Sequence, residues 1–370
     1  MHTDNDIYKE IRPYNDDEVS DAIQRLVNDK EFTTAILNYR FPQFSGVLGW
    51  LLIPLIKRFL INKWSNVKTV EDVQQQVAKY MHATIKHSCD GVTFSGLDKL
   101  DPNQAYLFVS NHRDIAMDPA MVNWCMFHEK FNTVRIAIGD NLLKKPCATE
   151  LMRLNKSFIV KRSAKAPREV LKSLGLLSSY ISNSLETGNP VWIAQKEGRA
   201  KDGNDKTDPT ILKMFFMEGR KRKQSFTEFM PSLNIVPIAI SYENDPCDVA
   251  KANELYQKQT SGSYEKGELE DIDSIIQGIV GQKRRIHVSF GDVIKDPIET
   301  PEELAVEIDR QITTNYRLFP ANYIAAGIEH DSVTPEEKAK FDEKLSPLPL
   351  GVATILKDMY AYPARKQLES

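Results

Sequence analysis

From about residue 90 onward, short runs rich in β-branched and aromatic residues alternate with segments long enough to form helices. This alternation constrains the fold most, because it is the pattern of a β-sheet layered with helices. The predicted strands are YLFV at 106–109, VRIAI at 134–138, SFIV at 157–160, PVWIA at 190–194, NIVPIAISY at 234–242 and RRIHVSF at 284–290. The sequence therefore predicts an α/β fold with a central mixed sheet flanked by helices.

The first 90 residues follow a helical pattern instead. Val19, Ile23, Leu26 and Val27 recur at the spacing that places apolar side chains on one face of a helix. We therefore predict three regions along the chain. They are an N-terminal helical region over residues 1–90, an α/β domain over 91–298, and C-terminal helices over 299–370 that pack on the same domain.

Several helix boundaries are marked by local signals. Pro167 and Gly188 bracket one predicted helix, with proline early and glycine after the end. Thr300 and Thr334 each open a Thr-Pro-Glu-Glu sequence, which predicts a capping box at the start of a helix. The polar stretch over 253–273 is predicted to be a long surface excursion.

Composition excludes some classes of protein. The chain has 370 residues, 41% of them apolar, and a formal net charge of -3, which argues against a generally basic nucleic-acid binder. Its four cysteines form no C-x-x-C pair and are expected to be reduced thiols in the cytoplasm. The polar, acidic N-terminus lacks the order of a signal peptide.

An apolar segment near the N-terminus suggests contact with a membrane surface. Residues 45–56 read SGVLGWLLIPLI and are followed by Lys57 and Arg58. A membrane-spanning helix needs about 20 apolar residues, so this segment is too short to cross a bilayer. Two interpretations stay open for 45–64: an interfacial anchor that lies in one leaflet, or a buried core helix.

One histidine lies where chemistry is expected. His112 belongs to the sequence Ser110-Asn-His-Arg-Asp-Ile-Ala-Met-Asp118-Pro119, between a predicted strand and a helical segment. Ligands of α/β sheets bind at such strand ends. A nearby carboxylate would fix the tautomer of the imidazole and favour its role as a general base. The alternatives are a turn histidine beside a helix-capping Asp118, and a metal site, although no other histidine shows a ligand-like spacing with His112.

Two further predicted strands end in cations. Residues 158–162 read FIVKR, and residues 191–203 read VWIAQKEGRAKDG. Arginine and glycine at strand ends suit the capture of a phosphate, although solvated charged loops have the same composition. Residues 144–172 carry nine Lys or Arg against two Glu, a local charge of +7. This segment suits the phosphates of lipids or coenzyme A, an acidic acyl carrier protein or a membrane surface, or is an ordinary solvated basic face.

Taken in chain order, and with the strand that holds Val236 and Pro237, these blocks resemble the glycerophospholipid acyltransferase family. The group contains lysophosphatidate and glycerol-3-phosphate acyltransferases, and the resemblance covers about residues 90 to 245. It implies the fold of that family and a catalytic histidine and aspartate. The site residues that it implies are His112 as base, Asp118 as its orienting carboxylate, Arg162 with the neighbouring Lys161 as phosphate ligands, and Glu197, Gly198 and Arg199 as the acceptor loop.

The sequence departs from the family pattern at two places. Five residues separate His112 from Asp118 where the family has four, so Asp114 is an alternative partner for the histidine. The acceptor loop also lacks the residue that the family places between glycine and arginine. Either Arg199 or Lys201 could therefore bind the phosphate.

The resemblance implies an O-acyltransferase of phospholipid synthesis. It would move a fatty acyl group from acyl-CoA or acyl-ACP to a hydroxyl of a phosphorylated glycerol acceptor, first of all 1-acylglycerol 3-phosphate. The reaction would need no acyl-enzyme, cofactor or metal, and the protein would act at the inner face of the cytoplasmic membrane. The alternatives are an amino-alcohol lipid acceptor, a non-catalytic lipid-binding protein at the membrane surface, and a metal-dependent hydrolase that uses His112, Asp114 and Asp118.

Overall fold

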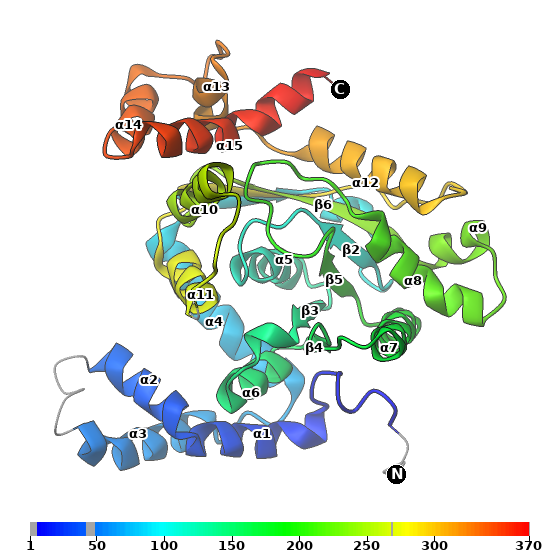
Figure 1. The fold of residues 1–370 in the computed structure, drawn as a ribbon. Coiled ribbons are helices and arrows are strands. Elements are labelled where there is room, and N and C mark those ends of the chain that lie inside the picture. The colour runs from blue at the N-terminus through cyan, green and yellow to red at the C-terminus, as the bar shows by residue number, and fades with distance from the viewer. Residues whose placement is uncertain (1–5, 42–48, 268, 370) are drawn as a thin grey trace. The chain divides into compact units, whose positions relative to one another are not determined.

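The computed structural model describes residues 6–41, 49–267 and 269–369 (Figure 1). These residues form two compact units, which we describe separately. Unit 1 falls within Met1–Tyr80 and Val134–Tyr180, and unit 2 within Met81–Thr133 and Ile181–Ser370. This is a division by contacts in space, and the boundaries near residues 90 and 298 stay a prediction from the sequence.

Unit 2 contains a mixed sheet. Its strands are β1 (Gly91–Ser95), β2 (Leu107–Ser110), β5 (Val191–Ala194), β6 (Ile235–Tyr242) and β7 (Arg285–Phe290), in the order β1-β7-β6-β2-β5. Strand β2 pairs in parallel with both β5 and β6, whereas β6 and β7 are antiparallel. Every residue of β2 and β6 is buried, as expected for central strands covered on both faces. The predicted mixed sheet is confirmed, although β1 was not among the predicted strands.

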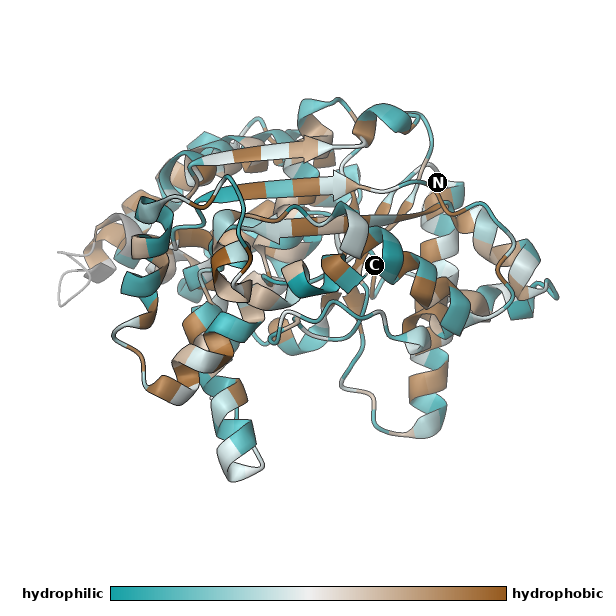
Figure 2. Ribbon diagram, turned by 90° about the horizontal axis from the view of Figure 1, so that it is seen from above, coloured by the Kyte–Doolittle hydropathy of each residue, from teal (hydrophilic) through white to brown (hydrophobic). Residues whose placement is uncertain are grey.

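Helices surround the sheet of unit 2. They are α5 (Met117–His128), α8 (Pro209–Lys221), α9 (Phe226–Phe229), α10 (Asp248–Ser261), α11 (Glu270–Val280), α12 (Pro301–Asn315), α13 (Pro320–Ala326), α14 (Pro335–Leu345) and α15 (Leu350–Glu369). Hydrophobic and hydrophilic residues are interspersed along the helices of the ribbon (Figure 2). The stretch over 253–273, predicted to be a long surface excursion, is mostly exposed, but α10 and α11 make it helical for most of its length.

Unit 1 combines helices with two strands. Strands β3 (Arg135–Gly139) and β4 (Ser157–Val160) are parallel. The helices are α1 (Asp16–Asn28), α2 (Lys30–Arg40), α3 (Gly49–Trp64) and α6 (Pro146–Leu154), while α4 (Val70–Ser88) and α7 (Pro167–Glu186) each contain a boundary between the units. Val19, Leu26 and Val27 are buried, which confirms the predicted apolar face of α1. Each helix in the described part of the chain is too short or too polar to cross a bilayer.

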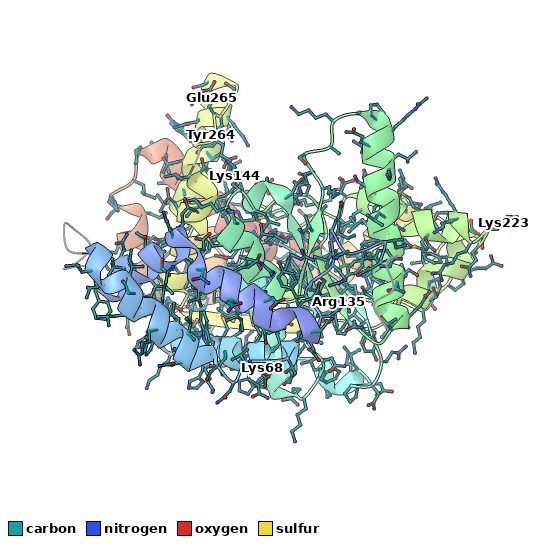
Figure 3. The ribbon with its side chains drawn as sticks, turned by 90° about the horizontal axis from the view of Figure 1, so that it is seen from below. Lys68, Arg135, Lys144, Lys223, Tyr264 and Glu265 are labelled. Atoms are coloured by element: carbon teal, nitrogen blue, oxygen red, sulfur yellow. The ribbon has the colours of Figure 1, made fainter. Side chains whose placement is uncertain are left out.

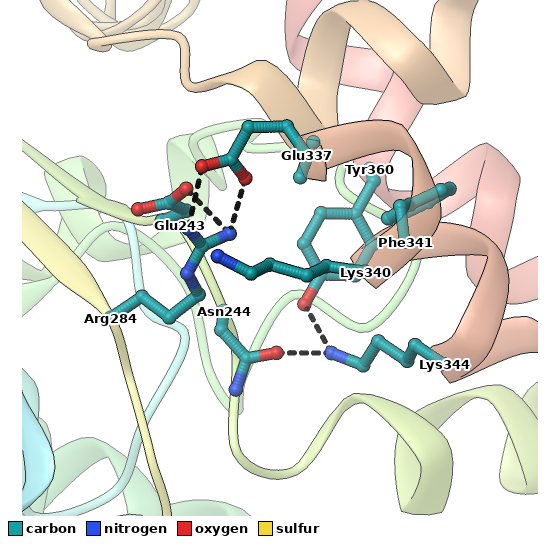
Figure 4. Close-up of a pocket in the computed structure, with 9 residues that line it drawn as sticks. Glu243, Asn244, Arg284, Glu337, Lys340, Phe341, Lys344 and Tyr360 are labelled. Carbon is teal, nitrogen blue, oxygen red and sulfur yellow. Dashed lines mark hydrogen bonds and ion pairs between the residues drawn. The ribbon is translucent and has the colours of Figure 1, made fainter. Parts of the chain in front are cut away.

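The C-terminal helices are fixed to unit 2 by apolar and charged contacts. Glu243 follows β6 and its side chain is fully buried. Arg284 lies 2.9 Å from Glu243 and also pairs with Glu337 of α14 at 2.7 Å (Figure 4). Lys344 donates to the hydroxyl of Tyr360 on α15 at 3.1 Å, beside a cavity of about 60 Å³. Because Glu243 directly follows a central strand, these contacts link the last two helices to the end of the sheet that carries the candidate site.

Candidate active site

His112 and Asp118 are hydrogen-bonded to each other. Strand β2 ends at Ser110 and α5 begins at Met117, so His112 lies in the connecting loop and Asp118 in the first turn of the helix. The Nδ1 atom of His112 lies 2.8 Å from Oδ2 of Asp118. The imidazole side chain is 14% exposed and the carboxylate is fully buried. A carboxylate that accepts from Nδ1 leaves Nε2 as the nitrogen that can take a proton from a substrate.

The Asp118 carboxylate receives four hydrogen bonds. Oδ2 accepts from His112 and also from the backbone N–H groups of Arg113, at 2.6 Å, and Asp114, at 2.9 Å. Oδ1 accepts from the hydroxyl of Tyr242 at 2.8 Å. Burial raises the pKa of Tyr242 well above its usual value of 10, so this hydroxyl stays a donor. The loop therefore accommodates its fifth residue by turning two consecutive backbone amides toward one carboxylate oxygen.

Asp114 has a different place in the loop. Its Oδ1 atom accepts from the backbone N–H groups of Ala116 and Met117. N–H groups at the start of a helix have no partner within the helix, so Asp114 satisfies them. Burial and then the nearby Asp118 carboxylate raise the pKa of Asp114. The alternative pairing of His112 with Asp114 is therefore wrong for this geometry, and the capping role that the alternative interpretation gave to Asp118 falls to Asp114.

Buried polar side chains fix the His112 loop to strand β6 and to Asp205. The Arg113 side chain is buried and donates to Asp205 at 2.5 Å. Asn111 donates to the same Asp205 oxygen at 3.2 Å and exchanges hydrogen bonds with the backbone of Ile240 on β6. A buried arginine needs such a partner, because an unpaired charge in the interior is costly. The residue after the histidine is thus a structural anchor.

A buried lysine from α10 supports the same loop. The ammonium group of Lys251 donates to the backbone carbonyl of Arg113 at 2.6 Å and pairs with Asp245. Only 2% of the Lys251 side chain is exposed. Its two partners therefore compensate a charge that is almost completely removed from water.

The predicted acceptor loop lies against the histidine. The backbone N–H of Ala200 donates to the carbonyl of His112 at 2.8 Å. Glu197 and Gly198 are exposed, and Gly198 has a φ of +77°, which glycine adopts without strain. Arg199 precedes Ala200, so the loop between β5 and α8 places its backbone beside that of His112.

The two candidate cations of this loop differ in their partners. Lys201 pairs with Glu254, and burial lowers the pKa of Lys201. Arg199 donates one hydrogen bond, at 3.3 Å, to the hydroxyl of Ser274 on α11. Among the residues that the structure describes, no carboxylate pairs with Arg199, and its Nη1 atom is buried without a hydrogen-bond partner. Of these two candidates, Arg199 is therefore the one with capacity for an anionic ligand.

Lys161 and Arg162 belong to unit 1, at and after the end of β4. Lys161 pairs with Glu10 at 2.7 Å. The backbone N–H of Arg162 donates to Asp140 at 3.0 Å. The His112 loop belongs to unit 2, so contact of these two side chains with the acceptor phosphate stays a prediction. In the described ranges, no three His, Cys, Asp or Glu side chains are placed to hold a metal ion.

Sequence reasoning missed five residues that support the loop, and they are Asn111, Arg113, Asp205, Tyr242 and Lys251. Asn111 and Arg113 flank the histidine, so a search for polar neighbours would have found them. The other three lie between 90 and 140 positions away along the chain, and only the fold brings them to the loop. Tyr242 had one usable signal, because it is the last residue of the predicted strand over 234–242.

A histidine at the end of a sheet strand, oriented by a buried carboxylate and flanked by a loop with an arginine, has the geometry of a general base beside a cation. Residues 91–241 match the family model described as Acyltransferase. The match confirms the predicted resemblance to acyltransferases over these residues.

Comparison with curated proteins found no match. The solved structures that resemble the chain include the 1-acyl-sn-glycerophosphate (LPA) acyltransferase PlsC from Thermotoga maritima. The two sequences are 13% identical, the match covers 80% of this chain and 94% of that chain, and the TM-score is 0.41.

Replacing Tyr242 with phenylalanine tests the support of the catalytic pair. The change leaves one buried oxygen of Asp118 without its donor, and a hydrogen bond to a charged group contributes about 1.5–3 kcal/mol. We expect kcat for acyl transfer to fall by about tenfold or more, a changed pH profile of kcat, and little change in the acceptor KM. Tyr106→Phe is the matched control, since this buried hydroxyl bonds to Asp101 and Gln104 instead. Equal kcat and pH profiles for Tyr242→Phe and wild type would contradict the assignment.

Proposed function

We propose that the protein transfers a fatty acyl group from acyl-CoA or acyl-ACP to a free hydroxyl of a phosphorylated glycerol lipid, with 1-acylglycerol 3-phosphate as the preferred acceptor. The observation that carries this proposal is the 2.8 Å contact of His112 with the buried Asp118. It occurs inside the segment that matches the acyltransferase family. In the described part of the chain, Arg199 of the neighbouring loop pairs with no carboxylate, and this supports an anionic acceptor.

The geometry fits direct attack by the acceptor. Nε2 of His112 takes the proton of the hydroxyl while its oxygen attacks the thioester carbonyl. The imidazolium that forms is stabilised by the Asp118 carboxylate, whose position is fixed by its other three donors. Collapse of the tetrahedral intermediate breaks the carbon–sulfur bond, and the leaving thiolate takes the proton from the imidazolium. No acyl-enzyme is needed.

The exposed face of α3 supports work at a membrane surface. Ile56 and Leu60 of this helix are buried in a cluster with Val27 and Leu37, whereas Leu55 and Phe59 are 64% and 58% exposed. Leu51 continues the exposed face one turn earlier, and Arg58 and Lys63 are also exposed. Apolar and basic side chains on one helix suit an anionic lipid surface. Residues 45–48 of the predicted anchor lie outside the described part of the chain.

We place the protein at the inner face of the cytoplasmic membrane, where phosphorylated lipid acceptors and acyl thioesters meet. In this proposal α3 combines both earlier interpretations of its segment. One face packs in the core of unit 1, and the other faces lipid.

Replacing His112 tests catalysis directly. A general base usually contributes a factor of about 10² to 10⁴, so we expect His112→Ala to lower kcat by at least about a hundredfold. Asp118→Asn should cause a loss of similar size, because a neutral amide does not stabilise an imidazolium. Steady-state transfer from acyl-CoA to 1-acylglycerol 3-phosphate is the measurement, with the exposed His82→Ala as control. If wild-type protein binds lipid vesicles but acylates no acceptor, it is a non-catalytic lipid-binding protein.

The choice between Arg199 and Lys201 is tested by matched neutral variants. We expect Arg199→Gln to raise the KM for 1-acylglycerol 3-phosphate by about tenfold or more, because a charge-assisted contact with the phosphate is lost. Lys201→Gln should change this KM less than about threefold, since its ammonium group already pairs with Glu254. Neither change should affect the KM for a monoacylglycerol without phosphate. Equal KM values for both acceptors in the wild type would contradict a phosphate-binding role.

The membrane face of α3 is tested by a double substitution. We expect Leu55→Ser with Phe59→Ser to weaken binding to vesicles that contain phosphatidylglycerol by about tenfold, because two large apolar side chains no longer enter the lipid. Cosedimentation with the vesicles is the measurement. Leu171→Ser, at a 62% exposed position of α7 in the same unit, is the matched control. Unchanged binding by the double variant would reject this face as the anchor.

A further inference from the structure

Helix α11 has its large apolar side chains on the outside. Five exposed aliphatic residues lie along one side of α11, the first of them directly before the helix begins. They are Leu269 at 58% exposure, Ile272 at 41%, Ile276 at 53%, Ile279 at 38% and Val280 at 61%. The inward face carries the small residues Ser274 and Gly278, which are buried. This distribution is the reverse of that in an ordinary surface helix. We call the five aliphatic residues the α11 ridge.

The inward face of α11 contacts the candidate active site. A Cβ atom on Gly278 would come within 2.1 Å of Oδ2 of Asp114, so only glycine permits this approach. The hydroxyl of Ser274 accepts the hydrogen bond from Arg199, and its carbonyl accepts from the thiol of Cys247. The helix is therefore seated on both the His112 loop and the acceptor loop.

The C-terminal end of α11 is held firmly. Lys283 is fully buried, and its ammonium group donates to the carbonyls of Ile279 at 3.2 Å and Gly281 at 2.8 Å. It also donates to the hydroxyl of Ser88 on α4 at 3.0 Å. These carbonyls would otherwise lack partners at the helix end. The exposed ridge thus belongs to a helix anchored at its end and along its inner face.

The chemistry of the ridge favours hydrocarbon over a protein. It contains no Trp, Tyr or Arg, the residues that dominate protein–protein hot spots. Asp273 is exposed beside it, and Glu270 and Asp271 lie in the first helical turn, between Leu269 and Ile272. These acids oppose an acidic carrier protein.

At the tip of the α10–α11 hairpin, Tyr264 and Glu265 project at the periphery (Figure 3), and the hydroxyl of Tyr264 donates to Glu270 of α11.

We propose that the α11 ridge rests on the hydrocarbon region of the lipid that presents the acceptor, and that α11 thereby places the His112 and acceptor loops at the lipid surface. The contact is apolar and about 16 Å long, from the rise of about 1.5 Å per helical residue. This inference rests on the proposed function for the identity of the substrate. The ridge itself is defined independently of catalysis.

The test is a double substitution within the ridge, Ile272→Ser with Ile276→Ser. The probe is vesicles of zwitterionic phosphatidylcholine at high salt, where apolar contacts persist and the attraction of basic side chains is screened. We expect binding in cosedimentation to weaken by about tenfold or more. Transfer to vesicle-borne acceptor should fall in parallel, while transfer to a dispersed short-chain acceptor should change less than about twofold.

Two controls separate the explanations. Val306→Ser removes an aliphatic side chain that is 68% exposed on α12 of the same unit, and Ile276→Leu preserves the apolar character of the ridge; both should bind vesicles like wild type. Wild-type vesicle binding by the double variant would overturn the proposal. So would a stable wild-type dimer in size-exclusion chromatography with light scattering that the double variant abolishes. Loss of vesicle binding in a protein that acylates no acceptor would support the ridge and reject the proposed function.

Discussion

The buried carboxylate of Asp118 is the group on which the candidate site depends. It is removed from water, and such a charge is stable only when hydrogen bonds replace its hydration. The replacement comes from two places in the chain: the loop that supplies the His112 ring and two backbone amides, and the end of β6 that supplies the Tyr242 hydroxyl. Each donor also fixes the shape of the loop. The interaction that orients the imidazole therefore also determines the path of the backbone around it.

Two buried cations complete this arrangement. Arg113 belongs to the loop and pairs with Asp205. Lys251 pairs with Asp245 and donates to the backbone carbonyl of Arg113. Burial raises the pKa of Asp205 even though Arg113 lies beside it. Asp245 differs, since the charge of Lys251 and its hydrogen bonds outweigh the effect of burial and lower its pKa. Burying charged groups is costly in free energy of folding. These buried pairs therefore contribute more to fixing the position of the His112 loop than to the stability of the fold.

The sequence predicts most of the sheet and the central pair of the site, for physical reasons that differ. Strands such as 234–242 are continuous apolar runs because both faces of the sheet are covered, so composition alone identifies them. Strand β1 is short and only partly buried, and its residues Gly91–Ser95 carry no such run. His112 and Asp118 are six positions apart, within one turn and the start of one helix, so their contact is local. Asp205, Tyr242 and Lys251 reach the same loop through strand pairing and helix packing, which spacing along the chain does not encode.

The five-residue spacing between His112 and Asp118 shows how a local departure from a family pattern is absorbed. The additional position lets the loop place Asp114 at the start of α5, where it accepts from two backbone amides, while Asp118 remains free to face the histidine. That solution leaves the second oxygen of Asp114 buried against the backbone of Gly278. A Cβ atom at that position of α11 would require the Asp114 carboxylate or the helix to shift, so the small residue at Gly278 follows from the geometry of the His112 loop. Once the inward face is restricted to small residues, it contributes little apolar area. The large aliphatic residues on the outer face therefore gain little burial from packing on their own unit. A contact with lipid hydrocarbon, as proposed, would remove their apolar surface from water.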